Sequence, residues 1–203
     1  MRKPTVVVFD LGKVLVDFDF GIAARRIAAE GTISSQAVKD YIDHSPLLFR
    51  YETGRITREE FYDEICRVSG FRGGIDAFAT YFADIFAPIE PMIRWHARLR
   101  ELGYPTYILS NTNDLAVEHI RRSYPFFANF DGYIYSYQVK AMKPQPEIYA
   151  ALEAMAGAAG DELVFIDDRA ENVAAGVQRG WRGIVQENPE KTFAAAARMG
   201  VPV

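Results

Sequence analysis

Five short runs of β-branched and other apolar residues recur along the chain. They are TVVVF at 5–9, PTYIL at 105–109, DGYIYS at 131–136, ELVFI at 162–166 and RGIVQ at 182–186. Apolar residues recur with helical spacing in four stretches beside these runs, at 92–102, 115–122, 147–155 and 172–179. Continuous apolar strands that alternate with helices indicate a parallel sheet covered on both faces. The predicted fold class is therefore α/β.

The first and second runs are separated by roughly ninety residues, far more than an ordinary crossover connection. Thr57, with Glu60 three residues later, is typical of a helix start inside this segment. Apolar residues with helical spacing include Ile22, Ala23, Ile27 and Ala28, and then Phe78, Phe82 and Phe86. We therefore expect a helical cap at 17–88, inserted into a core formed by 1–16 and 89–203.

The composition is that of an ordinary globular protein, with 49% hydrophobic and 25% charged residues. A net charge of -4 argues against nucleic acid and anionic membranes as partners. No apolar run approaches the roughly 18 residues of a membrane span. Cys66 is the only cysteine, which excludes an internal disulfide and a thiolate metal cage. We predict a cytoplasmic protein that acts on a small molecule, and the oligomeric state stays open.

Polar residues follow the predicted strands where ligands bind in open parallel sheets, beyond the carboxyl ends. They are Asp10, Ser110, Asn111, Lys143, Asp167 and Asp168. Each alone has an ordinary explanation as a turn residue, a helix cap or a solvated lysine. Their joint occurrence in this order indicates one site. The two adjacent carboxylates at 167–168 would repel each other, and a bound cation would offset that cost.

These residue types suit phosphate ester hydrolysis. Asp10 can act as a nucleophile and form an aspartyl-phosphate. Mg²⁺ takes oxygen ligands and bridges to phosphate, and Asp10 with the acidic pair can supply such oxygens. Ser110, Asn111 and the backbone N–H groups after Ser110 can hold phosphate oxygens, while Lys143 neutralises developing charge. The sequence therefore predicts a Mg²⁺-dependent hydrolase of a small phosphorylated metabolite.

Four stretches, FDLGKVLVD, ILSNTN, KPQPEIY and FIDDRAEN, resemble in order the motifs of the haloacid dehalogenase-like (HAD) superfamily. That superfamily is named for dehalogenases but dominated by phosphatases, and the resemblance spans nearly the whole chain. It implies a Rossmann-like core with a helical cap. By position it implies that the nucleophile is Asp10, the phosphate binder Ser110, the stabilising lysine Lys143, and the metal site Asp10, Asp167, Asp168 and the Gly12 carbonyl. FDLGKVLVDFDF and LSNTN most resemble the branch with bacterial α-glucose-1-phosphate phosphatases, which implies a sugar phosphate substrate.

Gly12 departs from the usual phosphatase pattern. Phosphatases of this family usually have a second aspartate here, which protonates the leaving alcohol and then activates water. Glycine can do neither, and losing such a role typically costs about 10²–10⁴-fold in rate. Asp17 and Asp19 alternate along VDFDF and could substitute, although a solvated strand end is the better explanation for them. The sequence leaves open which group replaces the aspartate.

Two other functions compete with a phosphatase. A 2-haloacid dehalogenase would tolerate Gly12, because halide leaves without protonation. Such dehalogenases need no metal, however, and the acidic pair at 167–168 argues for one. A catalytically weak module that binds a phosphorylated ligand is the second alternative. A pure binder need not retain Asp10, Lys143 and the acidic pair together, so the phosphatase remains the leading prediction.

Overall fold

The computed structural model describes residues 5–203, so residues 1–4 of the predicted core lie outside the described part. A five-stranded sheet with the order β5-β4-β1-β6-β7 forms its centre. The strands are β1 (Val6–Phe9), β4 (Thr106–Ser110), β5 (Gly132–Tyr135), β6 (Leu163–Asp167) and β7 (Arg182–Val185). All neighbours in this sheet pair in parallel. Each of the five apolar runs thus forms a strand, and the α/β prediction is confirmed.

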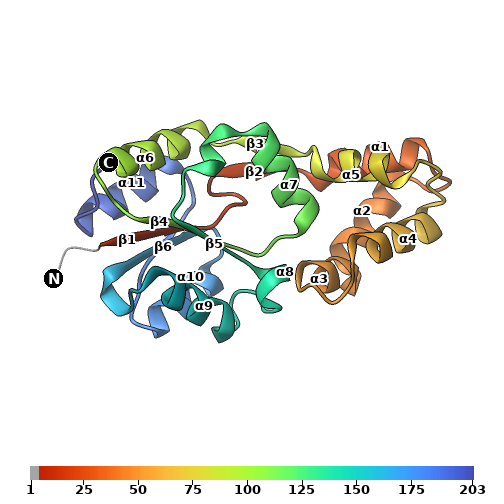
Figure 1. The fold of residues 1–203 in the computed structure, drawn as a ribbon. Helices are drawn as coiled ribbons and strands as arrows, with labels where there is room; N and C mark the ends of the chain where they lie inside the picture. Colours follow the sequence, from red (N-terminus) through yellow and green to blue (C-terminus); the bar gives the residue numbers. More distant parts are fainter. Residues whose placement is uncertain (1–4) are drawn as a thin grey trace.

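Helices cover both faces of the sheet (Figure 1). They are α6 (Glu90–Glu101), α7 (Asp114–Ser123), α9 (Pro146–Ala156), α10 (Ala170–Gln178) and α11 (Pro189–Arg198), with shorter turns α8 (Ser136–Val139), η1 (Pro125–Ala128) and η2 (Gly160–Glu162). Phe9 packs edge-on against Trp95 of α6, with ring centroids 5.6 Å apart. Val8, on the other face of β1, shares a buried cluster with Ile148 of α9. Because both faces are covered, every residue of β1 is buried, which explains its continuous apolar run.

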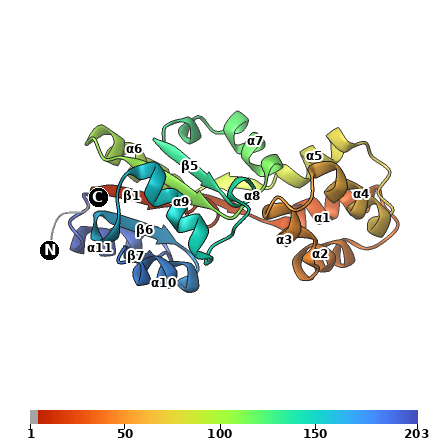
Figure 2. The same ribbon diagram turned by 60° about the horizontal axis from the view of Figure 1, so that its bottom comes forward.

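Residues 19–85, which lie between β1 and β4 ahead of α6, contain five helices. They are α1 (Phe20–Ala29), α2 (Ser35–His44), α3 (Pro46–Glu52), α4 (Arg58–Ser69) and α5 (Ile75–Ala83). They enclose a hydrophobic cluster of their own, in which Phe61 and Phe78 are fully buried. Thr57 caps α4 and Glu60 completes the capping box, as the sequence predicts. These helices lie beyond the carboxyl end of the sheet, opposite the chain termini (Figures 1 and 2).

A short antiparallel ribbon connects these helices to the sheet. It consists of β2 (Val16–Phe18) and β3 (Phe86–Pro88). The sequence did not predict this ribbon, and it wrongly grouped Phe86 with Phe78 and Phe82 on one helix. Helix α5 ends at Ala83, and Phe86 instead lies opposite Phe18 across the ribbon, with ring centroids 6.0 Å apart. The division at 17–88 stays a prediction, since the ribbon straddles both of its boundaries.

Within residues 5–203, no helix combines the length and the apolar character that crossing a membrane would require.

Candidate active site

The strand order brings the predicted acids together. Asp10 follows β1, and its backbone N–H donates to the Ile166 carbonyl of neighbouring β6 at 2.8 Å. Asp167 ends β6 and Asp168 follows it directly. One carboxylate oxygen from each of Asp10, Asp167 and Asp168 lies within 4.8 Å of the others. Ser110 ends β4 on the other side of β1, so the site straddles three adjacent strand ends.

Lys143 lies buried between two of these carboxylates, with its side chain only 1% exposed. Its Nζ lies 2.9 Å from Asp10 Oδ1, and it donates to Asp167 Oδ2 at 2.6 Å and to the Leu109 carbonyl at 2.8 Å. An ammonium has three donors, so protein oxygens accept all of them. Burial alone would lower the pKa of Lys143, but Asp10 and Asp167 outweigh burial and raise the pKa. The lysine therefore stays charged and holds Asp10 in place.

The site carries an excess of negative charge. Burial raises the pKa of Asp10 to about 7, while Lys143 acts in the opposite direction and Asp167 adds to the rise. Burial also raises the pKa of Asp168, and repulsion from Asp167 adds to that shift. Three carboxyl groups face one ammonium, and a divalent cation would offset this imbalance. Oxygen donors alone suit a hard cation, so the donor set fits Mg²⁺.

The two adjacent aspartates have different surroundings. Asp167 is fully buried and accepts hydrogen bonds from the Arg169 N–H at 2.8 Å and from Asn172 Nδ2 at 3.0 and 3.2 Å. Asp168 is half-buried and lines an open hollow of about 630 Å³ together with Asp10 and Gly12. Asp167 is thus held by protein donors, whereas Asp168 faces the space that a cation and a substrate would enter.

Ser110 and Asn111 have different positions in the site. The Ser110 hydroxyl has one long contact, 3.4 Å to the Asn111 carbonyl, which leaves it available for a ligand. The Asn111 amide donates to the Lys143 carbonyl at 3.0 Å and accepts from the Lys143 N–H at 2.8 Å. The Asn111 side chain therefore fixes the lysine loop. Its predicted role in substrate binding stays a prediction, which would have to rest on its backbone N–H.

A buried glutamine, which the sequence did not single out, positions the loop after the nucleophile. Gln186 follows β7, and its Nε2 donates to the carbonyls of Lys13 at 2.9 Å and Val14 at 3.2 Å. Lys13 has a φ of 58°, in the left-handed region that costs energy for a residue with a side chain. Gln186 is therefore positioned to hold a strained turn. No local sequence pattern indicates this role of Gln186, because its hydrogen-bond partners lie more than 170 residues away in the sequence.

The surroundings of Gly12 and the positions of Asp17 and Asp19 bear on the missing aspartate. A Cβ atom on Gly12 would lie 2.8 Å from Cε1 of Phe18, so the phenyl ring occupies the space of a larger side chain. Asp17 pairs with Lys13 and its side chain is 62% exposed. Asp19 caps α1 by accepting the Gly21 N–H at 2.7 Å. Both aspartates are exposed and neither lines the two hollows beside the strand ends, which favours a solvated strand end for both.

The helices of the insertion contact the core beside the site. Arg58 of α4 donates to Asp114 Oδ2 at 2.6 Å and to Glu118 Oε1 at 2.5 Å, both on α7. The Tyr51 hydroxyl of α3 also donates to Asp114. Ser136 of α8 donates to the Glu52 carbonyl at 2.6 Å. These contacts fix α3 over the strand ends.

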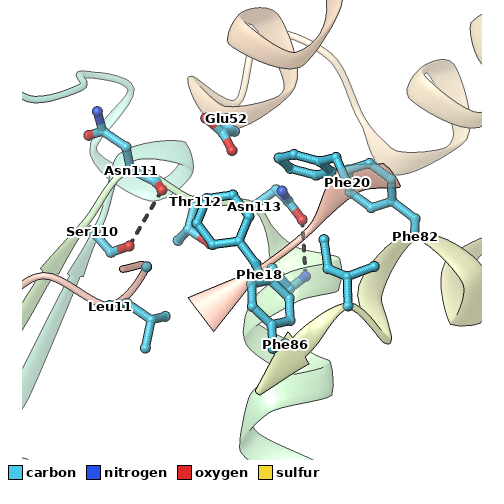
Figure 3. Close-up of a pocket in the computed structure, with 13 residues that line it drawn as sticks. Leu11, Phe18, Phe20, Glu52, Phe82, Phe86, Ser110, Asn111, Thr112 and Asn113 are labelled. Atoms are coloured by element: carbon cyan, nitrogen blue, oxygen red, sulfur yellow. Dashed lines mark hydrogen bonds between the residues drawn. The ribbon is translucent and has the colours of Figure 1, made fainter. Parts of the chain in front are cut away.

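A pocket of about 450 Å³ lies between the insertion and the strand ends. Figure 3 shows the rings of Phe18, Phe20 and Phe82 on one side, and the residues that follow β4 on the other. The Glu52 carboxyl reaches into the same pocket from α3. The pocket therefore combines an apolar wall with a few polar groups, as small-molecule sites usually do.

A parallel sheet with three carboxylates and a buried lysine at its strand ends defines the class of HAD-like hydrolases. The family model described as haloacid dehalogenase-like hydrolase matches residues 4–180. The chain belongs to this family, which confirms the resemblance found in the four motifs.

Two curated relatives are phosphatases. The D-ribitol-5-phosphate phosphatase of Bacteroides thetaiotaomicron is 24% identical over 189 residues, which cover 90% of this chain and 91% of the relative. A sesquiterpene phosphatase of Aspergillus oryzae is 26% identical over 138 residues, which cover 66% of this chain and 69% of the relative.

Solved structures of the family superpose closely. A HAD family enzyme of Bacteroides thetaiotaomicron, in complex with magnesium and inorganic phosphate, is 26% identical with a TM-score of 0.80 over 91% of this chain and 94% of that chain. The L-2-haloacid dehalogenase of Xanthobacter autotrophicus is 19% identical with a TM-score of 0.65 over 98% of this chain and 84% of that chain. The second likeness concerns the fold alone.

Proposed function

We propose that the protein is a Mg²⁺-dependent phosphomonoester hydrolase that acts through an aspartyl-phosphate on Asp10. The observation that carries this proposal is the cluster of Asp10, Asp167 and Asp168 oxygens within 4.8 Å of one another, with Lys143 beside two of them. A buried carboxylate next to an ammonium and further oxygen donors suits attack on a phosphate dianion. The phosphatase names of two relatives support the same reaction.

The first step transfers the phosphoryl group to the protein. A carboxylate oxygen of Asp10 attacks phosphorus, and the bond from phosphorus to the ester oxygen breaks. Lys143 favours the ionised form of Asp10 against the effect of burial, and the Leu11 N–H, 2.7 Å from Asp10 Oδ1, fixes the orientation of the carboxylate. The Ser110 hydroxyl holds a non-bridging phosphate oxygen. Water then attacks phosphorus, releases phosphate and regenerates Asp10.

Asp10, Asp168 and the Gly12 carbonyl would hold Mg²⁺ in this proposal. The carboxylate of Asp167 already accepts hydrogen bonds from Lys143, Arg169 and Asn172. Asp167 would therefore hold Lys143 rather than bind the metal. When bound, Mg²⁺ supplies positive charge that stabilises the phosphoryl oxygens in the transition state. A complex of a structural relative with magnesium and phosphate supports this choice of metal.

We propose a sugar or polyol phosphate as the substrate class. The name of the ribitol-5-phosphate phosphatase and the resemblance to glucose-1-phosphate phosphatases support this class. The phenyl rings of Phe18 and Phe20 line the pocket and can pack against the C–H face of such a substrate. A panel of phosphorylated metabolites, ranked by kcat/KM, tests this assignment, and preference for a prenyl phosphate would contradict it.

Turnover of p-nitrophenyl phosphate tests the proposed activity. We expect phosphate release that depends on Mg²⁺ and no chloride release from a 2-haloacid under the same conditions. Chloride release without phosphate release would instead identify a dehalogenase. Tight binding of inorganic phosphate without turnover of any ester would identify a binding module.

We further propose that residues 17–88 act as a cap that excludes water from the site. Arg58 links α4 to Asp114 and Glu118 of α7 and so favours the closed position. Partly exposed ion pairs contribute roughly 1 kcal/mol or less each. Arg58→Ala should therefore lower kcat/KM about threefold to tenfold.

Arg67→Ala is the matched control for Arg58→Ala. Arg67 lies on the same helix but pairs within it, with Glu64. Steady-state kinetics and thermal unfolding should be measured for both variants. An equal loss of kcat/KM in both variants would contradict a role for Arg58 in closure. So would a loss of kcat/KM in Arg58→Ala that is matched by a lower melting temperature.

A further inference from the structure

The proposed reaction needs a proton donor that the core does not supply. An alcohol leaves a phosphate ester slowly unless its oxygen is protonated as the bond breaks. Gly12 stands where the family's acid would be, and the Phe18 ring fills the space beside it. Asp17 and Asp19 are engaged elsewhere, with Lys13 and with the start of α1. The donor must therefore come from another element that lines the pocket.

Glu52 is the acid that meets this requirement. It is the last residue of α3, and it lines both hollows beside the strand ends. Asp10 and Lys143 line one hollow, and Ser110 and Phe82 line the other. Figure 3 shows its carboxyl reaching from α3 toward the loop that follows β4. No other carboxyl lines both described hollows.

We infer that Glu52, supplied by the insertion rather than by the core, is the general acid and base of the proposed phosphatase reaction. This inference rests on the proposed function. In the first step the ester bond breaks, its electron pair goes to the leaving oxygen, and Glu52 gives that oxygen a proton. In the second step Glu52 takes a proton from the water that attacks phosphorus. The bond from phosphorus to Asp10 then breaks, and Glu52 is protonated again.

The surroundings hold Glu52 in this position. Ser136 is fully buried and donates to the Glu52 carbonyl at 2.6 Å, which ties the end of α3 to the core. Two residues later, Gly54 has a φ of 62°, and a Cβ atom there would lie 2.3 Å from the Tyr137 carbonyl. Only glycine allows this close approach. The backbone around Glu52 is therefore placed by contacts with α8.

The protonation of Glu52 suits an acid that works near neutral pH. Burial raises the pKa of its carboxyl to about 7, and a hydrogen bond with Asn113 acts in the opposite direction. The charged groups that share its hollow are Asp10, Lys13, Lys143, Asp168 and Arg169. The acid must be protonated for the first step, so this contribution is present below the raised pKa and is lost as pH rises through it.

A series of phosphate esters with graded leaving-group acidity tests the inference. Substituted phenyl phosphates and benzyl phosphate should be compared on wild type and Glu52→Gln at saturating Mg²⁺. For p-nitrophenyl phosphate, whose leaving group needs no proton, kcat/KM should change less than about threefold. For benzyl phosphate, kcat/KM should fall about 10²–10⁴-fold. The variant should also lose the fall in kcat/KM that wild type shows above about pH 7 with benzyl phosphate.

The matched control is Glu59→Gln, an exposed acid in the first turn of α4 that should leave both substrates unaffected. Thermal unfolding checks that Glu52→Gln is folded. An equal loss on all esters, or no loss on benzyl phosphate, would overturn the role of Glu52. If wild type hydrolysed none of these esters, the proposed function itself would fail instead.

Discussion

Asp10→Asn is expected to abolish phosphate ester hydrolysis, lowering kcat by at least about a thousandfold. An amide oxygen is a poor nucleophile, so no aspartyl-phosphate can form. The fold should survive, because asparagine has nearly the same volume and can still accept the Leu11 N–H. Lys143 keeps its hydrogen bonds to Asp167 and Leu109, so its charge is not left without a partner. Steady-state turnover of p-nitrophenyl phosphate, together with thermal unfolding, measures both effects.

Asp17→Asn is the control for this change. Asp17 lies on β2 close to the site in sequence, but its side chain is exposed and pairs with Lys13. It should retain wild-type turnover. Activity of Asp10→Asn above about a tenth of wild type would contradict the assignment of the nucleophile.

Removal of Mg²⁺ is expected to lower kcat/KM by at least about a hundredfold, because several kcal/mol of charge stabilisation are lost. Three carboxyl groups and a phosphate dianion would then face Lys143 alone. Protein treated with a chelator should regain activity on addition of Mg²⁺. Turnover of p-nitrophenyl phosphate across a Mg²⁺ titration measures the requirement.

Variants of the adjacent aspartates sharpen this test. Asp168→Asn should raise the Mg²⁺ concentration needed for half-maximal activity, because Asp168 faces the open hollow. Asp167→Asn should lower activity at every Mg²⁺ concentration, because Lys143 loses a partner at 2.6 Å. Full activity of wild type in excess chelator would contradict the metal requirement and favour a dehalogenase.

The sequence predicted the parts of the fold that repeat a simple pattern. The central strands are buried on both faces, so each reads as an apolar run, and their carboxyl ends carry the polar residues of the site. The β2–β3 ribbon was missed because each strand has three residues and is defined by pairing across 70 residues. A three-residue strand has no periodicity to detect. For the same reason Phe86 was assigned to a helix.

The supporting residues of the site could not be predicted because the fold alone creates their contacts. Glu52 is one of many acids in a helical segment, and only the position of α3 beside the residues that follow β4 gives it a pocket. Gln186 gains its role from the Lys13 and Val14 carbonyls at the other end of the chain. Asn111 was predicted beside the phosphate, yet its side chain holds the Lys143 backbone. The spacing of residues along the sequence does not determine where their side chains point. That direction decides whether a residue faces the pocket, as Glu52 does, or holds the backbone, as Gln186 and Asn111 do.

Trapping of the covalent intermediate tests the central proposal most directly. Wild type should be mixed with p-nitrophenyl phosphate and Mg²⁺, quenched with acid on the millisecond timescale, and analysed by peptide mass spectrometry. The account predicts one phosphoryl group on the peptide that contains Asp10, labile to hydroxylamine, and none in Asp10→Asn. Glu52→Gln should accumulate more of this species, because its breakdown lacks the base. Phosphate release without a phosphorylated Asp10, or with the label on another residue, would contradict the account.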